Sequence, residues 1–180
     1  MERPDPLDAE AAALQVDAAA HARRVRRGLA RQDLDEATLA AMLVDWAERD
    51  ATVVLELLDG QRRTGRIVAV GADFAELRGA DGTTFLRIDA MFAAIGGPEA
   101  GRPPGQRTPA TSRWTLRDAL AALEPDRPRI GVRALGGEPL RGRLLDVGAD
   151  VLRLQLDGDA GAVAYVALAS LAEASVTGSG

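Results

Sequence analysis

An internal repeat is the feature that most constrains how this chain folds. When the sequence is shifted by 77 positions against itself, residues 38–77 lie over residues 115–154 without a gap, with twelve identical pairs in forty positions. Both copies contain the string Gly-Arg-x-x-x-Val-Gly-Ala-Asp, which ends at Asp73 in the first copy and at Asp150 in the second. Self-similarity of this kind is typical of a duplicated structural unit. We therefore expect one unit to occur twice, folded in the same way.

Each copy opens with signals for a short helix. Asp33 and Thr115 are each followed three residues later by an acidic residue, which is the spacing of a capping box. Apolar residues then recur at helical spacing: Leu39, Met42, Leu43 and Trp46 in the first copy, and Leu116, Leu120 and Leu123 in the second. We expect the second helix to end at Pro125, because proline lacks the N–H donor that a helix needs.

Five short strand signals follow each helix. In the first copy they cover residues 52–58, 65–70, 74–77 and 84–88, with a fifth that ends near residue 95; in the second they cover 130–135, 142–147, 151–156, 163–166 and 171–176. Asp-Gly pairs at 59–60 and 81–82 predict turns between strands of the first copy. Because five short strands cannot bury both faces as a flat sheet, we expect each copy to bend into a small, nearly closed barrel.

The chain divides into four segments on these signals. We expect an N-terminal helix in residues 1–32, a helix with the first small barrel in 33–97, a linker rich in proline and glycine in 98–112, and a helix with the second barrel in 113–180.

Glycine and aspartate residues that recur in both copies of the repeat are expected to shape turns and strand junctions. These structural residues are Gly60, Gly65, Gly71, Asp73, Gly137, Gly142, Gly148 and Asp150. Asp73 and Asp150 are also candidate catalytic carboxylates because they recur. Each follows a glycine at a strand junction, however, where an aspartate side chain bonds nearby backbone amides and fixes the turn. We interpret both as structural.

The barrel motifs resemble those of the Sm-like family. Residues 58–66, Leu-Asp-Gly-Gln-Arg-Arg-Thr-Gly-Arg, look like the first half of the Sm1 motif, and residues 135–143 repeat its glycines. More narrowly, two Val-Gly-Ala-Asp barrels behind an N-terminal helix resemble a family that is common in high-GC actinobacteria. The resemblance implies a mainly β fold with α: an N-terminal helix followed by two repeated helix-plus-five-stranded Sm-like or SH3-like small barrels. It implies no activity.

The chain departs from the Sm pattern where Sm proteins bind RNA. Those proteins place Asp and Asn after the strand glycine, whereas Gly-Ala precedes the aspartate here and adds one residue. The asparagine region holds Ala75 or Glu76 in the first copy and Leu152 or Arg153 in the second. The Arg-Gly pair of the second Sm motif is also missing. The RNA pocket of the family therefore cannot be carried over to these residues.

The residue inventory excludes several kinds of active site. The chain contains no cysteine, lysine or asparagine, which removes thiolate chemistry, Schiff-base lysines and a P-loop. Its glycine-rich segments lack the spacing of a dinucleotide-binding loop. His21 is the only histidine and has no partner at a metal-binding spacing, so we expect it to pack on its helix. The serines lack the context of a nucleophile elbow. We expect no enzyme, no cofactor and no metal.

One local charge feature lies in the N-terminal helix. Five arginines fall within eleven residues on one broad helix face: Arg23, Arg24, Arg26, Arg27 and Arg31. Such a basic amphipathic helix can contact phosphate backbones. It can equally be a solvated face, because acidic residues lie near the helix start and the arginines near its end, as the helix dipole favours. A thin apolar seam between Leu7 and Gly28 predicts that the helix docks against another element.

The bulk charge and the chain start bear on location and partners. The net charge of −5 gives no long-range attraction to nucleic acid or anionic lipid. No signal segment opens the sequence and no apolar run approaches the roughly 20 residues that span a bilayer, so we expect a cytoplasmic protein without a membrane partner. The favoured function is a non-enzymatic protein-interaction or assembly module that binds a protein partner or a further copy of itself. The alternative is an RNA- or DNA-binding regulator that uses the arginine helix and binds weakly.

Overall fold

A computed structural model describes residues 38–97, 113–158 and 161–177. The expected N-terminal helix, with the arginines at 23, 24, 26, 27 and 31, and the expected linker at 98–112 lie outside the described residues. The described residues of both repeats belong to one compact unit of the chain.

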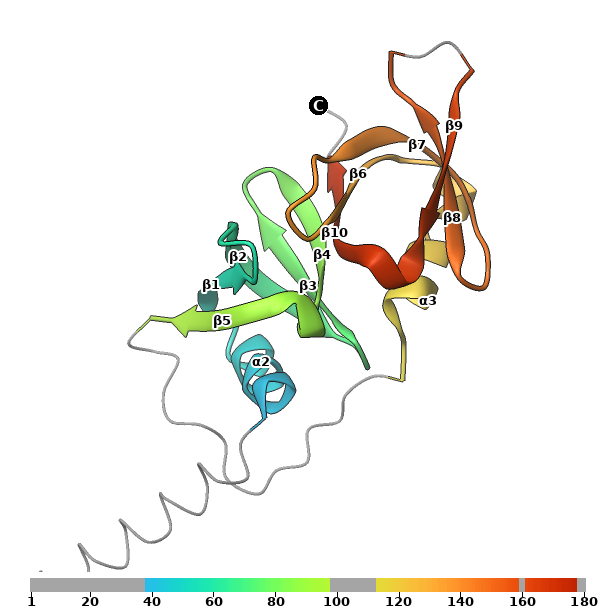
Figure 1. The fold of residues 1–180 in the computed structure, drawn as a ribbon. Coiled ribbons are helices and arrows are strands. Elements are labelled where there is room, and N and C mark those ends of the chain that lie inside the picture. The colour runs from blue at the N-terminus through green and yellow to red at the C-terminus, as the bar shows by residue number, and fades with distance from the viewer. Residues whose placement is uncertain (1–37, 98–112, 159–160, 178–180) are drawn as a thin grey trace, which may run out of the picture. The chain divides into compact units, whose positions relative to one another are not determined.

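In residues 38–97 the first repeat contains one α-helix and five strands, which Figure 1 labels. They are α2 (Leu39–Glu48), β1 (Thr52–Leu57), β2 (Arg62–Val70), β3 (Phe74–Gly79), β4 (Gly82–Arg87) and β5 (Met91–Gly96), with a 3-10 turn η1 (Ile88–Ala90) before β5. The helix begins after Thr38, whose hydroxyl accepts a hydrogen bond from the Ala41 N–H at 3.1 Å. The N-cap of α2 is therefore Thr38. The capping-box spacing predicts Asp33 instead, and this prediction is wrong for α2.

The second repeat has the same order of elements, with an additional 3-10 turn after its helix. They are α3 (Leu116–Ala121), η3 (Glu124–Asp126), β6 (Arg129–Ala134), β7 (Leu140–Val147), β8 (Val151–Leu156), β9 (Val163–Ala167), η4 (Leu168–Ser170) and β10 (Leu171–Thr177). Thr115 and Asp118 form the expected capping box at the start of α3. The helix ends at Ala121, and Pro125 lies in the 3-10 turn that follows it.

The expected fold of two repeated helix-plus-five-stranded barrels is wrong. The ten strands form one antiparallel sheet in the order β5-β1-β2-β3-β4-β10-β6-β7-β8-β9, and this sheet does not close. The expectation assumed that each repeat satisfies its own edges. Instead β4 of the first repeat pairs with β10 of the second. Each repeat thus provides the hydrogen-bonding partners for one edge strand of the other, and β5 and β9 lie at the two ends of the sheet.

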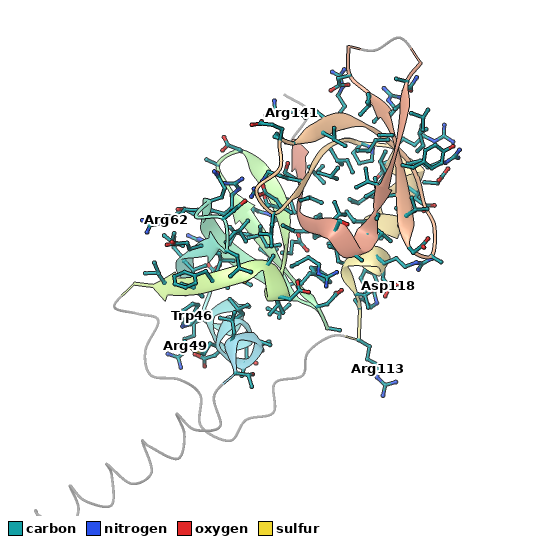
Figure 2. All side chains as sticks on the ribbon, in the orientation of Figure 1. Trp46, Arg49, Arg62, Arg113, Asp118 and Arg141 are labelled. Carbon is teal, nitrogen blue, oxygen red and sulfur yellow. The ribbon has the colours of Figure 1, made fainter. Side chains whose placement is uncertain are left out.

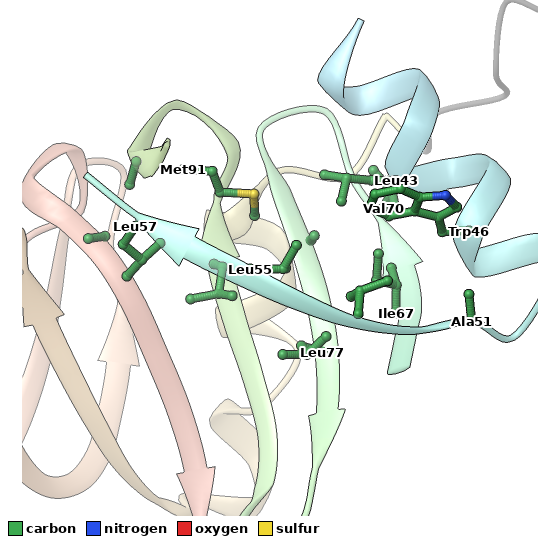
Figure 3. Close-up of a cluster of buried hydrophobic side chains, with 14 residues drawn as sticks. Leu43, Trp46, Ala51, Leu55, Leu57, Ile67, Val70, Leu77 and Met91 are labelled. Carbon is green, nitrogen blue, oxygen red and sulfur yellow. The ribbon is translucent and has the colours of Figure 1, made fainter. Parts of the chain in front are cut away.

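Two clusters of buried apolar side chains underlie the sheet. In the first, Leu43 and Trp46 of α2 pack near Val70 and Ile67 of β2, as Figure 3 shows. The second gathers α3 and strands of the second repeat, and it also takes in Phe74 and Phe85 from the first repeat. Their rings lie with centroids 5.9 Å apart. The second core is therefore completed by aromatic side chains from the other repeat.

Candidate functional site

The junction between the repeats is built first from backbone pairing. Strands β4 and β10 run antiparallel, with Phe85 opposite Ala174 and Leu86 opposite Glu173. β10 also pairs with β6 along its other side. The hydrogen-bonding edge of one repeat is thus covered by the edge of the next, which removes two of the four edges that separate sheets would expose.

The Val-Gly-Ala-Asp motif of the first repeat lies in this junction. The Asp73 carboxylate accepts a hydrogen bond of 2.7 Å from the backbone N–H of Leu116, the first residue of α3. Next to it, the Ala72 N–H donates to the Trp114 carbonyl at 2.7 Å. A Cβ on Gly71 would lie 2.5 Å from that carbonyl oxygen, so glycine allows the close approach. The motif therefore holds the start of the other repeat's helix.

Sequence reasoning found this motif but assigned it a local role. Asp73 does not bond nearby amides, because its partner lies 43 residues away along the chain. The carboxylate also lies at the N-terminal end of a helix, where the exposed N–H groups and the helix dipole favour negative charge. The side chain of Asp150 makes no hydrogen bond or ion pair with the described residues. The two copies of the motif thus have different surroundings in a single chain.

A cluster of four charged side chains also joins the repeats. Arg63 on β2 donates two hydrogen bonds to Glu173 on β10, at 2.9 and 2.8 Å. Arg133 on β6 donates to Glu173 at 3.0 Å and also to Asp59, in the turn between β1 and β2. The Arg133 and Glu173 side chains are only 9% and 8% exposed. Charge-assisted bonds that are this well shielded are among the stronger polar contacts in a protein.

The cluster shifts the titration of two of its members. The backbone N–H of Gly136 bonds the Asp59 carboxylate at 3.0 Å and, with the Arg133 guanidinium and the Gln61 N–H, holds the pKa of Asp59 at about 2 against its ordinary 3.8. Burial alone would lower the pKa of Arg133, but the bonds to Asp59 and Glu173 outweigh burial and raise it. Both groups are therefore charged throughout the physiological range.

The turn and strand glycines occupy the places where a side chain would not fit or would be strained. Gly60 has φ +81° in the turn between β1 and β2. In the second repeat it is Gly136, with φ +66°, that takes the left-handed conformation, and not the expected Gly137. Gly65 and Gly142 lie within strands, where a Cβ would come within 2.5 Å and 2.2 Å of the neighbouring strand's carbonyl oxygens. Gly148 follows β7 and bonds the Val151 carbonyl through its N–H.

The two end strands, β5 and β9, each pair with one other strand among the described residues. Their exposed faces carry large apolar side chains: Phe92 is 69% exposed, Ile95 48%, Val163 39% and Tyr165 68%. Neither strand contains proline or any charged residue. Proteins ordinarily protect such edges with charges, proline or a covering element. Exposed apolar side chains beside unpaired backbone groups are features of a docking site.

A groove of about 840 Å³ crosses the junction, lined by residues of both repeats. Its lining includes four arginines and three aspartates: Arg127, Arg129, Arg141, Arg143, Asp81, Asp126 and Asp157. Arg129 pairs with Asp157 at 2.9 Å and lies directly opposite Arg143 in the ladder of β6 and β7. Arg141 extends from the start of β7 (Figure 2). Sequence reasoning missed this groove because the charges of the second repeat balance overall, although Arg-x-Arg occurs twice.

The positions that align with the Sm asparagine region do not form a pocket. Ala75 and Leu152 are fully buried in the two cores. Arg153 pairs with Asp146, and the pKa of Glu76 is raised because it is partly buried.

Within residues 38–97, 113–158 and 161–177, no group of three metal-ligating side chains occurs. Ser175 lies on β10 and donates to the Gly131 carbonyl at 3.4 Å. His21 lies outside the described residues.

Comparison with known proteins gives one partial match. A protein named anthranilate phosphoribosyltransferase from Streptomyces griseus subsp. griseus is 45% identical over 71 residues, which are 38% of this chain and 20% of that protein. The chain thus spans about a fifth of the length of the relative that it matches. No family model matches. Among the helices of the described residues, none has the length and apolarity needed to cross a membrane. A match that covers so little of either chain assigns neither a family nor an activity.

Proposed function

We propose that this chain is a non-enzymatic protein-interaction and assembly module that binds protein partners at the free edges of its sheet. The pairing of β4 with β10 carries the proposal, because it joins two repeats through strand edges within this same chain. The free strands β5 and β9 correspond in position to β10 and β4. Strand addition at such an edge supplies main-chain hydrogen bonds, and the side chains on alternate positions supply specificity.

The composition of the free edges supports protein binding over solvent exposure. An exposed β strand with apolar side chains and no charge promotes unwanted aggregation unless a partner covers it. Both β5 and β9 are of this kind, and their sequences are Met-Phe-Ala-Ala-Ile-Gly and Val-Ala-Tyr-Val-Ala. We place this role in the cytoplasm. The non-enzymatic part of the proposal rests on the residue inventory, which lacks cysteine, lysine and any paired nucleophile and base.

Site-specific photocrosslinking tests the proposal. A benzophenone side chain is introduced in place of Phe92 or Tyr165. In a control it replaces Val68, which is also exposed but lies on β2, a strand with a neighbour on each side. After illumination in the source cells, mass spectrometry identifies the crosslinked peptides. We expect protein adducts from both edge positions and few from position 68. Equal adduct yields at all three positions, or none at the edges, would contradict the proposal.

Nucleic-acid binding remains a second candidate function, and the arginine groove favours it. Arg127, Arg141 and Arg143 form no ion pair with the described residues, and opposed arginines across a ladder repel unless an anion lies between them. Three aspartates in the same lining reduce the attraction, which agrees with weak binding. The test is fluorescence anisotropy with single-stranded RNA and DNA during a salt titration. Arg141→Gln with Arg143→Gln should reduce both the affinity and the salt slope; unchanged binding would exclude the groove.

A further inference from the structure

The internal junction has two different sides, and the chain contains each side twice. The first repeat contributes what we call the donor side: Asp73, Phe74 and strand β4. The second repeat contributes the acceptor side: helix α3 and strand β10. By the repeat, a second donor side lies at Asp150, Val151 and β9, and a second acceptor side lies at α2 and β5. Both of these are unpaired in the described sheet.

The strand ladders define which residues correspond. Phe74 lies opposite Arg87 in the first repeat and Val151 opposite Ala167 in the second, so that Phe85 corresponds to Tyr165. Leu55 lies opposite Ala94, and Val132 opposite Ala174. Ala94 on β5 therefore corresponds to Ala174 on β10.

The corresponding residues differ in burial in one consistent direction. On the donor side, Phe85 is 5% exposed at the internal junction, whereas Tyr165 is 68% exposed. On the acceptor side, Leu116, Ala119 and Ala174 are buried. Their counterparts Leu39, Met42 and Ala94 are only half-buried at the edge of the first core. The free ends thus expose the apolar surface that the internal junction covers.

The two groups that form the polar contact of the junction, a carboxylate and a helix N–H, have counterparts without partners at the free ends. Asp73 accepts a hydrogen bond from the N–H of Leu116, which is the first residue of α3. The corresponding N–H, that of Leu39 at the start of α2, has no partner among the described residues. The corresponding carboxylate, Asp150, is exposed and likewise has none. A carboxylate without a donor and a helix N–H without an acceptor are complementary if two chains meet.

The backbone of β9 is oriented for such a meeting. The Leu156 N–H bonds the Ala162 carbonyl at 2.9 Å, and the Leu168 N–H bonds the Asp150 carbonyl at 2.8 Å. Because bonded positions alternate along an antiparallel strand, residues 164 and 166 also face β8. The N–H and C=O groups of Tyr165 therefore face the free edge, as those of Phe85 face β10.

We propose that this chain binds a second copy of itself head to tail, with β9 and Asp150 of one copy joined to β5 and α2 of the next. This inference rests on the proposed function, since it uses the same free edges. In the expected register Tyr165 lies opposite Ala94 of the next copy, and Val163 opposite Gly96. The Asp150 carboxylate accepts the Leu39 N–H of that copy. The contact is heterologous, so that it generates a ring or a filament and not a symmetric pair.

The junction between copies differs from the internal one in charge. Position 63 corresponds to Leu140 and position 173 to Ala93, so that an apolar pair replaces the Arg63–Glu173 ion pair. Leu140 is 42% exposed in the single chain. The Asp59 position is Gly136, which has no carboxylate. Association between copies should therefore strengthen with salt that promotes apolar burial and should not require the charge cluster.

Two variants with complementary defects test the inference. Tyr165→Asp disrupts binding by the donor side, because it places a carboxylate where apolar contact is expected. Leu39→Asp spoils the acceptor side, and an acidic residue in the first turn still suits the helix. Val68→Asp is the matched control, since residue 68 is an exposed apolar residue away from both end strands. Circular dichroism and thermal unfolding check that each variant is folded.

Light scattering on a sizing column gives the mass of each sample. We expect the wild-type chain and the control to exceed the single-chain mass of 18.9 kDa. Each spoiled variant alone should be monomeric, and their equimolar mixture should form a species of twice that mass, because one intact donor side meets one intact acceptor side. A monomeric wild type, or a mixture that stays monomeric, would overturn the inference. Asp150→Ala should weaken association about tenfold, which is about 1.4 kcal/mol; no change would overturn the proposed cap.

The crosslinking experiment separates this inference from the proposed function. Two isotope-labelled forms of the protein are mixed before illumination. Adducts that join position 165 of one copy to peptides of α2 or β5 of a differently labelled copy support self-assembly. Adducts to a different protein keep the proposed function but overturn the second copy as the partner. If position 165 gives no protein adduct, the self-assembly inference falls; if position 92 gives none either, the proposed function falls with it.

Discussion

Replacing Glu173 with alanine tests whether the charge cluster holds the repeats together. The carboxylate accepts three hydrogen bonds, two from Arg63 and one from Arg133, and its side chain is 8% exposed. Arg63 is 29% exposed and can turn toward water after the change. Arg133 is 9% exposed and would keep only Asp59, while its Nε already lacks a partner among the described residues.

The expected cost follows from these differences. Removing one member of a buried ion pair ordinarily costs about 3 to 5 kcal/mol, because the remaining charge is left in a poorly hydrated place. Since Arg63 escapes to solvent and Arg133 retains Asp59, we expect the lower end, about 3 kcal/mol. Urea unfolding followed by circular dichroism measures the loss, and hydrogen exchange should show faster opening of β4 and β10 than of β2 and β3.

An exposed ion pair provides the matched control. Glu56 pairs with Arg62 at 2.8 Å, and the Arg62 side chain is 64% exposed. Glu56→Ala should therefore cost less than about 1 kcal/mol, as exposed pairs do. If Glu173→Ala costs no more than Glu56→Ala, the cluster does not stabilise the junction and the reasoning is refuted.

Three further changes test other contacts of the junction and the sheet. Asp73→Ala removes the acceptor at the start of α3 and should lower the free energy of unfolding in urea by about 0.5 to 2 kcal/mol. Asp150→Ala, made in the monomeric Leu39→Asp background, should change it by almost nothing. Equal losses would contradict the different roles of the two motifs. Gly142→Ala should cost about 1 to 3 kcal/mol, because the new Cβ would meet the Gln155 carbonyl at 2.2 Å, while Gly137→Ala has room and should be near neutral. The pKa of Asp59 is lowered from 3.8 to about 2, so its stabilisation is present above pH 3.8 and is lost as the pH falls toward 2; Asp59→Asn should remove that part of the acid dependence, and an unaltered acid profile would show that Asp59 contributes none of it.

The positions of the strands could be predicted from the sequence because local signals determine them. Apolar alternation and Asp-Gly turns mark strands within a few residues of their observed bounds, as for β1 at Thr52–Leu57 and β8 at Val151–Leu156. The repeat also gives the same order of elements in both halves. These features depend on neighbouring residues and leave a direct trace in the pattern.

The pairing of edges could not be predicted in the same way. Whether β4 closes on its own repeat or joins β10 depends on contacts between residues about 90 positions apart, such as Phe85 with Ala174. The role of Asp73 was hidden for the same reason, since its partner Leu116 lies in the other repeat. The ion cluster of Arg63 and Glu173 is likewise absent from the repeat pattern, because its residues have no charged counterparts at Leu140 and Ala93.

Amide hydrogen exchange at the two free edges, measured over a range of protein concentrations, tests the central claim most directly. Residues 164 and 166 face β8, and their amides should be protected at every concentration. The amide of Tyr165 faces the free edge, and so does that of Ala94 on β5 by the repeat. Both should exchange rapidly in dilute protein and become protected together as the concentration rises. Rapid exchange of Tyr165 and Ala94 at all concentrations would contradict the claim that these edges bind another copy of the chain.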